Sequence, residues 1–276
     1  MADLPLLTSK EVAAFVAHGF LRFDDLVPSA LSQAALAELA AGTVPTGWNR
    51  PPGSAGSGLA GRPLAELWTE SPGIGAVLRL PRVAGILHSL LGAGALYDHH
   101  YAHVIAPRQP WSQPWHADAV LDRRPLAFDI QLLFFFHDTP REMGGTMILP
   151  GSHLRRANEL DISRTQNFRG QLATVCRAGT LIVCHHGLWH CGQPNGTDRP
   201  RTMFKVRLGP AHRQVRCWDL ADLDDPAVTQ TLRHEHAFTG NDARLEIVNR
   251  IQLWRYLTDD PAFDIDYWLG RMADRR

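Results

Sequence analysis

The spacing of apolar residues predicts helices in the first third of the chain. From Thr8 to Leu39, two stretches at helical spacing follow capping Thr or Ser residues, and a short β-like run, GFLRF, lies between them. Residues 43–63 are rich in Pro, Gly and Ser and predict a loop. Helical spacing resumes at about residues 64–92. This region is therefore expected to be mainly helical.

The pattern changes between about Ala95 and Pro210, where short β-like runs are separated by turn residues. In chain order the runs are LYDHHYAHVIA, DIQLLFFF, TMILPGS, GTLIVCHH and RTMFKVRLG. Several short strands punctuated by turns are typical of a sandwich or a barrel. After Trp218 helical patterns return, in DDPAVTQTLRHEHAF and PAFDIDYWLGRMADRR.

These patterns predict one domain, mainly β with flanking helices, because neither flank is long enough to build an independent core. The domain spans residues 1–276. Its expected parts are a helical N-terminal region at 1–94, a β core at 95–210 and a helical C-terminal region at 211–276.

Composition narrows the partners that such a domain can have. The chain is 45% hydrophobic and 20% charged, and it carries 28 Lys and Arg against 28 Asp and Glu. A balanced charge does not supply the positive field that attracts nucleic acid or an anionic membrane surface. We therefore expect a small-molecule partner, no nucleic acid and no membrane. The oligomeric state, monomer or homodimer, stays open.

The N-terminal residues and the cysteines bear on the cellular compartment. The stretch MADLPLLTSKEVAAF lacks the basic and apolar segments of a signal peptide, and no apolar run approaches about 18 residues. The four cysteines form no CxxC pair, which argues against a disulfide scaffold or a thiolate zinc site. These features predict a cytoplasmic protein with reduced thiols.

The stretch PWHADAV, residues 114–120, contains the first candidate for chemistry. If it is extended, side chains alternate, so His116 and Asp118 point to one side and Ala117 to the other. Iron(II) in oxygenases is typically held by two imidazoles and one carboxylate, which leaves coordination positions open. A polar pair on the surface is the alternative, because a chain with 14 histidines contains such pairs by chance.

Two later residues can complete a metal site. His190 follows a strongly β-like run and precedes a turn rich in Gly, Pro and Asn, so a strand end can deliver it to a barrel mouth. Arg201 begins RTMFKVRLG, where alternation separates it from Phe204, Val206 and Leu208. A guanidinium suits a dicarboxylate such as 2-oxoglutarate. The spacing equally allows Arg201 to pair with an acidic neighbour.

Four stretches taken together resemble the phytanoyl-CoA dioxygenase-like family of Fe(II)- and 2-oxoglutarate-dependent oxygenases. They are HGFLRFDDLVP, WHAD, FFFHDTPREMGGTMILPGSHL and AGTLIVCHHGLWHCGQPNGTDRPR, in family order over about Gly19 to Arg207. The resemblance implies a double-stranded β-helix, which is a jelly-roll, cupin-like core. It also implies an enzyme that consumes O2 and 2-oxoglutarate, releases succinate and CO2, and oxidises a small organic substrate, with hydroxylation as the expected outcome.

The resemblance assigns roles to four residues. Iron is expected on His116, Asp118 and His190, and Arg201 falls at the position that binds 2-oxoglutarate. Because Asp118 is the carboxylate that related halogenases lack, halogenation is not expected.

Two positions depart from the family pattern. Relatives often carry a Ser or Thr hydroxyl two residues after the second His ligand, but Gly192 stands there in this chain. They also carry a Lys or another donor on the strand before HxD, where this chain offers His103 among other residues. Contacts to the cosubstrate besides Arg201 are therefore open, with His103 and Gly192 as candidates.

The substrate and the outcome of the reaction are also open. Candidate substrate contacts near the expected ligands are Trp111, Trp115, Trp189 and Arg123. Packing of the tryptophans and solvation of the arginine are the structural alternatives. Loop 43–63 and segment 119–128 are the expected places for a lid. A specialised metabolite is the favoured substrate class. Desaturation, cyclisation or epimerisation at the same iron centre is an alternative, as is a cupin-like binding protein without turnover.

Overall fold

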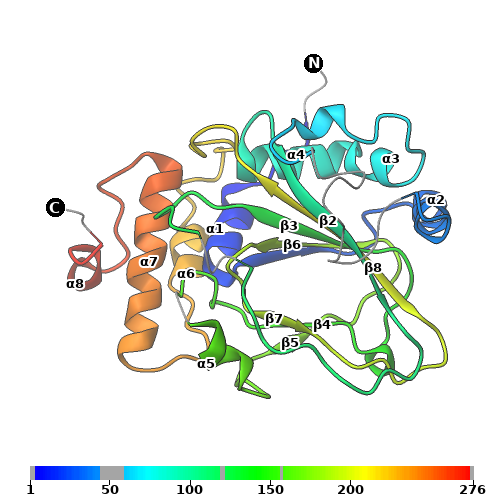
Figure 1. Ribbon diagram of the computed structural model, residues 1–276. Helices are drawn as coiled ribbons and strands as arrows, with labels where there is room; N and C mark the ends of the chain where they lie inside the picture. Colours follow the sequence, from blue (N-terminus) through cyan, green and yellow to red (C-terminus); the bar gives the residue numbers. More distant parts are fainter. Residues whose placement is uncertain (1–3, 44–58, 119–121, 156–157, 274–276) are drawn as a thin grey trace.

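Two antiparallel sheets form the centre of the protein in a computed structural model that describes residues 4–43, 59–118, 122–155 and 158–273 (Figure 1). The larger sheet contains, in spatial order, β1 (Phe20–Phe23), β6 (Thr180–His185), β3 (Ile130–Phe135), β8 (Arg201–Gly209) and β2 (Leu96–Ile105). The smaller sheet contains β5 (Leu172–Ala173), β4 (Thr146–Ile148) and β7 (His190–Gly192). The sheets face each other, and the predicted jelly-roll core is confirmed.

The large sheet is buried on both faces. Its outer face packs against the helices through Ile130, Leu132, Phe134, Leu181, Val183, Phe204, Val206 and Leu208. Its inner face packs toward Ile148 of β4 through Leu133, Phe135, Ile182, Cys184 and Met203. Burial on both faces explains why β3 and β6 are continuous apolar runs rather than alternating ones.

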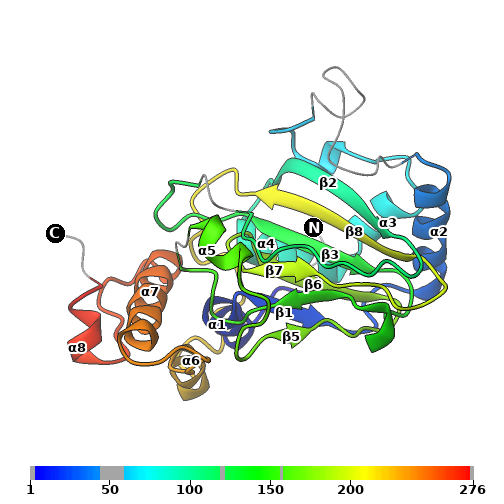
Figure 2. The same ribbon diagram turned by 60° about the horizontal axis from the view of Figure 1, so that its bottom comes forward.

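Helices cover the outer face and one end of the sheets. The N-terminal helices are α1 (Ser9–His18), α2 (Ser29–Ala40), α3 (Ile74–Leu78) and α4 (Pro81–Leu91), and 3-10 turns lie at Leu64–Glu66 and Arg141–Met143. The short helix α5 (Glu159–Ser163) precedes β5, and the C-terminal helices are α6 (Pro226–Leu232), α7 (Asn241–Thr258) and α8 (Tyr267–Gly270). Figure 2 shows α6, α7 and α8 gathered at one end of the molecule, where α1 lies beside α6.

The start of the chain joins the large sheet. Thr8 and Glu11 form a capping box at α1, and Gly19 ends that helix with a φ of 81° and leads into β1. β1 pairs with β6, which lies about 160 residues later in the chain. The range 95–210 predicted for the β core therefore leaves out one strand, because pairing between distant segments is not visible in a local pattern.

Several expectations concern residues that the structure does not describe. Residues 44–58 of the loop 43–63 and residues 119–121 of the segment 119–128 lie outside the described residues. The lid therefore stays a prediction.

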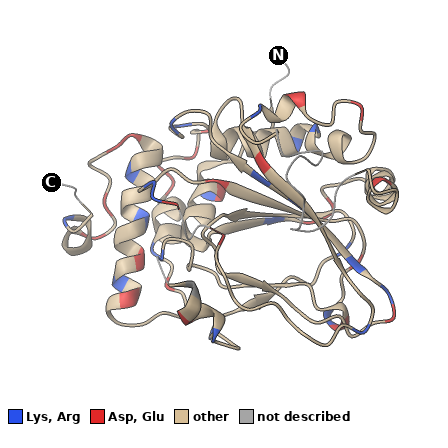
Figure 3. Ribbon diagram, viewed as in Figure 1, with Lys and Arg blue, Asp and Glu red and all other residues tan. Residues whose placement is uncertain are grey.

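Three further features concern the surface charge, the helices and the cysteines. Charged residues of both signs are scattered over the helices and strand ends (Figure 3). Of the helices in the described part of the chain, none is both long and apolar enough to cross a membrane. All four cysteines are free thiols, and three of them are buried.

Candidate metal centre and cosubstrate pocket

His116 and His190 face each other across an isolated antiparallel bridge. Each backbone N–H donates to the carbonyl of the other residue, at 3.1 and 3.0 Å. Directly opposed residues send their side chains to the same side, and the two ring centroids lie 4.3 Å apart. Two imidazoles at right angles on one ion, with metal–nitrogen bonds of about 2.1 Å, place their centroids about 4.5 Å apart. The pair therefore fits neighbouring positions of an octahedral ion.

Asp118 completes a group of three ligands. Its Oδ1 lies 3.9 Å from Nε2 of His116, and its Oδ2 lies 3.9 Å from Nε2 of His190. One ligand atom from each residue lies within 4.8 Å of the other two. Residues 114–118 are not a continuous strand, since His116 alone among them makes a bridge, but the spacing still brings His116 and Asp118 to one side.

The hydrogen bonds of the two imidazoles suit metal binding. Nδ1 of His116 donates to the carbonyl of Pro114, and Nδ1 of His190 donates to the carbonyl of Leu188, both at 2.9 Å. A carbonyl oxygen only accepts, so each Nδ1 carries the proton, and Nε2 of the neutral ring keeps the lone pair that can bind a metal. Burial, with His116 beside it, lowers the pKa of His190 to about 4, so this imidazole is neutral at pH 7.

Asp118 is held as a carboxylate by the groups around it. Burial alone would raise its pKa, but His190, Lys205 and His116 outweigh burial and hold the pKa of Asp118 well below its usual range. The buried ammonium of Lys205 lies 2.8 Å from Oδ2, and the Gln131 side-chain amide donates to the same oxygen. Both donors therefore engage Oδ2, and Oδ1 is the oxygen nearer to His116.

Lys205 and Gln131 are functional candidates that the sequence patterns did not single out. Alternation places Lys205, four residues after Arg201, on the same side of β8 as Arg201. Gln131 is the one polar residue that follows the initial Asp in the run DIQLLFFF. A polar residue inside a strand that is buried on both faces was the available signal.

Arg201 lies at the start of β8, 5% exposed. One of its terminal nitrogens donates to the carbonyls of Met143 and Gln193 at 2.8 and 3.0 Å. No carboxylate among the described residues lies within ion-pair distance of it, so the alternative of an acidic neighbour has no support there. Burial lowers the pKa of Arg201 to about 10, which leaves the guanidinium charged at pH 7.

Arg201 shares a cavity with the histidine ligands. The lining includes His103, Gln113, His116, Thr146, His190, Gly192, Arg201 and Lys205. Nε2 of His103 is buried there without a hydrogen-bond partner, and burial lowers the pKa of His103 to about 3. A buried cation and an unpartnered imidazole nitrogen beside two metal-ligand candidates fit an anionic cosubstrate that binds the metal and the guanidinium together.

Gly192 contributes its backbone rather than a side chain. Its N–H donates to Oε1 of Gln113 at 3.0 Å, and a Cβ atom at Gly192 would lie 2.9 Å from that oxygen. The Gln113 side chain therefore occupies the space into which a Ser or Thr at this position would extend.

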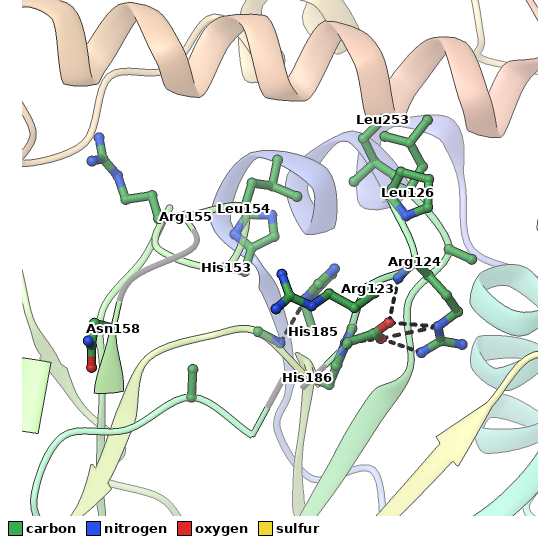
Figure 4. A pocket seen from close by; sticks show the side chains of 15 residues that line it. Arg123, Arg124, Leu126, His153, Leu154, Arg155, Asn158, His185, His186 and Leu253 are labelled. Carbon is green, nitrogen blue, oxygen red and sulfur yellow. Dashed lines mark hydrogen bonds and ion pairs between the residues drawn. The ribbon is translucent and has the colours of Figure 1, made fainter. Parts of the chain in front are cut away.

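Figure 4 shows a second cavity, of about 330 Å³, whose lining includes Ala117, the residue between His116 and Asp118 in the chain. Its lining includes Arg123, Arg124, Arg155, His153, His185 and His186. Arg124 is paired with Asp122 and Asp129, and Arg155 is paired with Glu246. Within the described residues Arg123 makes no ion pair, so it brings an uncompensated positive charge to this cavity.

The three tryptophans predicted as substrate contacts line neither cavity. Trp111 is 68% exposed. Trp115 and Trp189 are buried in an apolar cluster with Leu149, Ile162 and Cys191, and the Trp115 indole donates to the carbonyl of Gln166. Each of these two tryptophans directly precedes a histidine of the bridge, so alternation turns it away from the cavity that contains Arg201.

The sequence matches a known protein family and an individual relative. The sequence pattern of the phytanoyl-CoA dioxygenase family matches residues 15–203. The uncharacterized protein Rv1501 of Mycobacterium tuberculosis is 28% identical over 171 residues, which is 56% of this chain. The match spans 60% of the length of that relative.

Two solved structures share the fold. The epimerase SnoN, in complex with Fe3+, alpha ketoglutarate and nogalamycin RO, has a TM-score of 0.55 and 18% identity over 73% of this chain and 83% of that one. EctD from S. alaskensis, with 2-oxoglutarate and 5-hydroxyectoine, has a TM-score of 0.56 and 19% identity over 76% and 78% of the two chains. Because the family pattern covers more than half of the residues, the chain belongs to the phytanoyl-CoA dioxygenase family.

Proposed function

We propose that this protein is an Fe(II)- and 2-oxoglutarate-dependent dioxygenase that hydroxylates a small organic substrate and releases succinate and CO2. The observation that carries the proposal is the arrangement of His116, Asp118 and His190 around one point, beside the buried, uncompensated guanidinium of Arg201. Bound iron and 2-oxoglutarate would supply the oxidation with O2 that side chains alone cannot perform.

The side chains divide the work of binding and orientation. His116, Asp118 and His190 would hold Fe(II) on one face and leave positions open for cosubstrate and O2. Arg201 would hold the distal carboxylate of 2-oxoglutarate. Nε2 of His103, which has no hydrogen-bond partner among the described residues, would face the cosubstrate in the same cavity. The hydrogen bonds from His116 and His190 to backbone carbonyls fix both rings in the required tautomer.

The cavity lined by Arg123 is the proposed substrate site. Its volume of about 330 Å³ lies in the range of small-molecule pockets. Because Arg123 brings an unpaired cation to a lining whose other arginines are neutralised, we propose a metabolite with an anionic group. Desaturation, cyclisation and epimerisation require the same ligands, so analysis of the product decides among these outcomes.

The experiment that tests the proposal is conversion of 2-oxoglutarate to succinate by the purified protein with Fe(II) and O2. Succinate formed in proportion to protein, and abolished by a chelator, is the expected result. Tight binding of a metabolite with no succinate formed under any condition would instead favour the binding-protein alternative.

Replacing Arg201 with Gln is expected to raise KM for 2-oxoglutarate by about 30-fold or more, with a smaller change in kcat. The guanidinium contacts a part of the cosubstrate that does not react, and charge-assisted hydrogen bonds contribute about 1.5–3 kcal/mol. Steady-state kinetics over a range of 2-oxoglutarate concentrations measure this. Arg199→Gln, an exposed arginine two residues away, is the matched control. An unchanged KM in Arg201→Gln would remove Arg201 from the cosubstrate site.

Replacing Lys205 with Met is expected to destabilise the metal-free protein by about 3 kcal/mol, because the buried Asp118 carboxylate loses an adjacent cation. A divalent ion at the centre would supply positive charge in its place, so the loss should be smaller with metal bound. By linkage the variant then binds the metal more tightly. Urea unfolding with EDTA and with Mn(II) measures both values. Equal losses in the two conditions would show that Lys205 does not act through Asp118.

A further inference from the structure

Three histidines outside the candidate iron centre meet where α1 ends. His18 is the last residue of α1, and His234 and His236 follow α6, more than 200 residues later. Within the described residues this is the second of two groups of His, Cys, Asp or Glu side chains whose ligand atoms lie within 4.8 Å of one another. The sequence showed only the short repeat HEH at 234–236, because its third partner lies at the other end of the chain.

The spacing of the three rings fits a tetrahedral ion. The ring centroid of His18 lies 5.3 Å from that of His234 and 5.2 Å from that of His236. The ring centroids of His234 and His236 are 4.8 Å apart. Imidazoles at the tetrahedral angle, with zinc–nitrogen bonds of about 2.0–2.1 Å, place their centroids about 5.2 Å apart. The corresponding distance at the candidate iron centre, 4.3 Å, is shorter, as right-angled ligands require.

The hydrogen bond of His236 prepares one lone pair. Its Nε2 lies 2.9 Å from the carbonyl oxygen of Ala17, so Nε2 carries the proton and Nδ1 is the free donor to a metal. Burial lowers the pKa of both His18 and His236 to about 4, so both rings are neutral at pH 7. His234 is exposed, which leaves the site open to solvent on one side.

Other side-chain and backbone groups donate hydrogen bonds to the backbone around the three histidines. Gly151 donates its N–H to the carbonyl of His18, and a Cβ atom there would lie only 2.2 Å from Cδ2 of His236. The Arg250 guanidinium donates to the carbonyls of Leu232 and His234, and Glu246 neutralises its charge at 2.9 Å. The three rings are therefore placed by contacts that a bound metal would leave intact.

We propose that His18, His234 and His236 bind Zn(II) in a second metal site, with water as the fourth ligand. Three neutral imidazoles and an open fourth position are a known tetrahedral zinc arrangement, and imidazole sites bind Zn(II) more tightly than Fe(II). The ion would tie the end of α1 to the segment between α6 and α7. Since Leu253 of α7 lines the cavity that contains Arg123, and Glu246 of α7 pairs with Arg155 in that lining, the site would stabilise one wall of that cavity. The proposal does not depend on the proposed function.

The test measures Zn(II) bound to the untagged full-length chain in which His190→Ala disables the iron centre. Equilibrium dialysis and elemental analysis are expected to give one Zn(II) per chain for this variant and none after His234→Ala is added. Because His234 is exposed, that second change should leave the fold intact. His212→Ala, which removes an exposed histidine elsewhere, should leave the single Zn(II) in place.

Thermal unfolding supplies a second readout. Zn(II) at about 100-fold above its Kd is expected to raise the Tm of the His190→Ala chain by about 5 °C or more, and not to raise it when His234 is also replaced. Co(II) in the same site should show the intense visible bands of four-coordinate cobalt. Equal Zn(II) binding with and without His234, or no Zn(II) bound to the His190→Ala chain, would overturn the proposal.

Discussion

Replacing Asp118 with Ala is expected to abolish succinate formation and to weaken Fe(II) binding by at least about 100-fold. Removal of groups that merely orient metal ligands costs 10–100-fold, so removal of a ligand should cost no less. The variant also leaves the buried ammonium of Lys205 without its nearest carboxylate, which adds a repulsive charge beside the metal position. His190→Ala should give the same loss of turnover.

Fe(II) binding under anaerobic conditions and succinate formation under air measure these losses separately. Asp224→Ala, at an exposed aspartate outside the centre, is the matched control and should behave like the unaltered protein. Full turnover by the Asp118→Ala chain would show that the three residues do not hold the catalytic metal. Normal Fe(II) binding without turnover would place Asp118 in catalysis but not in metal binding.

Lowering the pH from 6.5 to 5 is expected to destabilise the protein steeply, by about 1.4 kcal/mol per pH unit for each histidine that stays neutral in the folded chain. Burial holds the pKa of His153 and His185 well below the ordinary value and lowers the pKa of His103 to about 3. An unfolded histidine titrates near pH 6.5, so below that pH the unfolded chain binds protons that the folded chain does not. Each such proton contributes about 1.4 kcal/mol per pH unit, and His18, His190 and His236, whose pKa burial lowers to about 4, add to the slope.

The loss of stability has a defined direction with pH and a defined pH range. The stability that these neutral histidines provide is complete above pH 6.5 and is lost as the pH falls toward their folded pKa values. The pKa of Asp118 is also held low, but its stability is lost only below about pH 4, where unfolded aspartates titrate. Urea unfolding at several pH values separates the two windows.

His185→Phe supplies the control for the acid effect. The ring of His185 already packs against Phe15 and Phe128, so a phenyl group suits the site sterically. The variant removes one of these titrating groups and should reduce the slope between pH 6.5 and 5 by up to about 1.4 kcal/mol per pH unit. A free energy of unfolding that does not change between pH 7 and 5 would contradict the burial of neutral histidines.

The sequence allowed the large sheet to be predicted wherever its strands carry their own signal. The strands β2, β3, β6 and β8 coincide with long β-like runs, because burial of a strand on one or both faces requires a recognisable local pattern of apolar residues. The bridge between His116 and His190 has no such signal, since it is a single pair formed between segments 74 residues apart. The spacing of His116 and Asp118, and the β-like run and turn residues on either side of His190, identified the two histidines as candidates, but not their pairing.

The substrate side of the site was harder to predict for a physical reason. The tryptophans beside the ligands are large and apolar, but residues adjacent to a ligand in an extended segment point away from it, so Trp115 and Trp189 pack instead. Lys205 stood in the correct alternating set, yet its role depends on Asp118, which reaches it from a distant segment. The same holds for His18 with His234 and His236. Contacts of this kind exist only after the chain has folded.

Anaerobic addition of Fe(II) and 2-oxoglutarate to the purified protein, followed by visible absorption, tests the central claim most directly. A weak metal-to-ligand band that requires both components and saturates at one iron per chain is the expected result. The band should disappear in His116→Ala, weaken in Arg201→Gln only at low 2-oxoglutarate, and persist in His234→Ala. Absence of the band when Fe(II) and 2-oxoglutarate are both in excess would contradict the assignment of this centre.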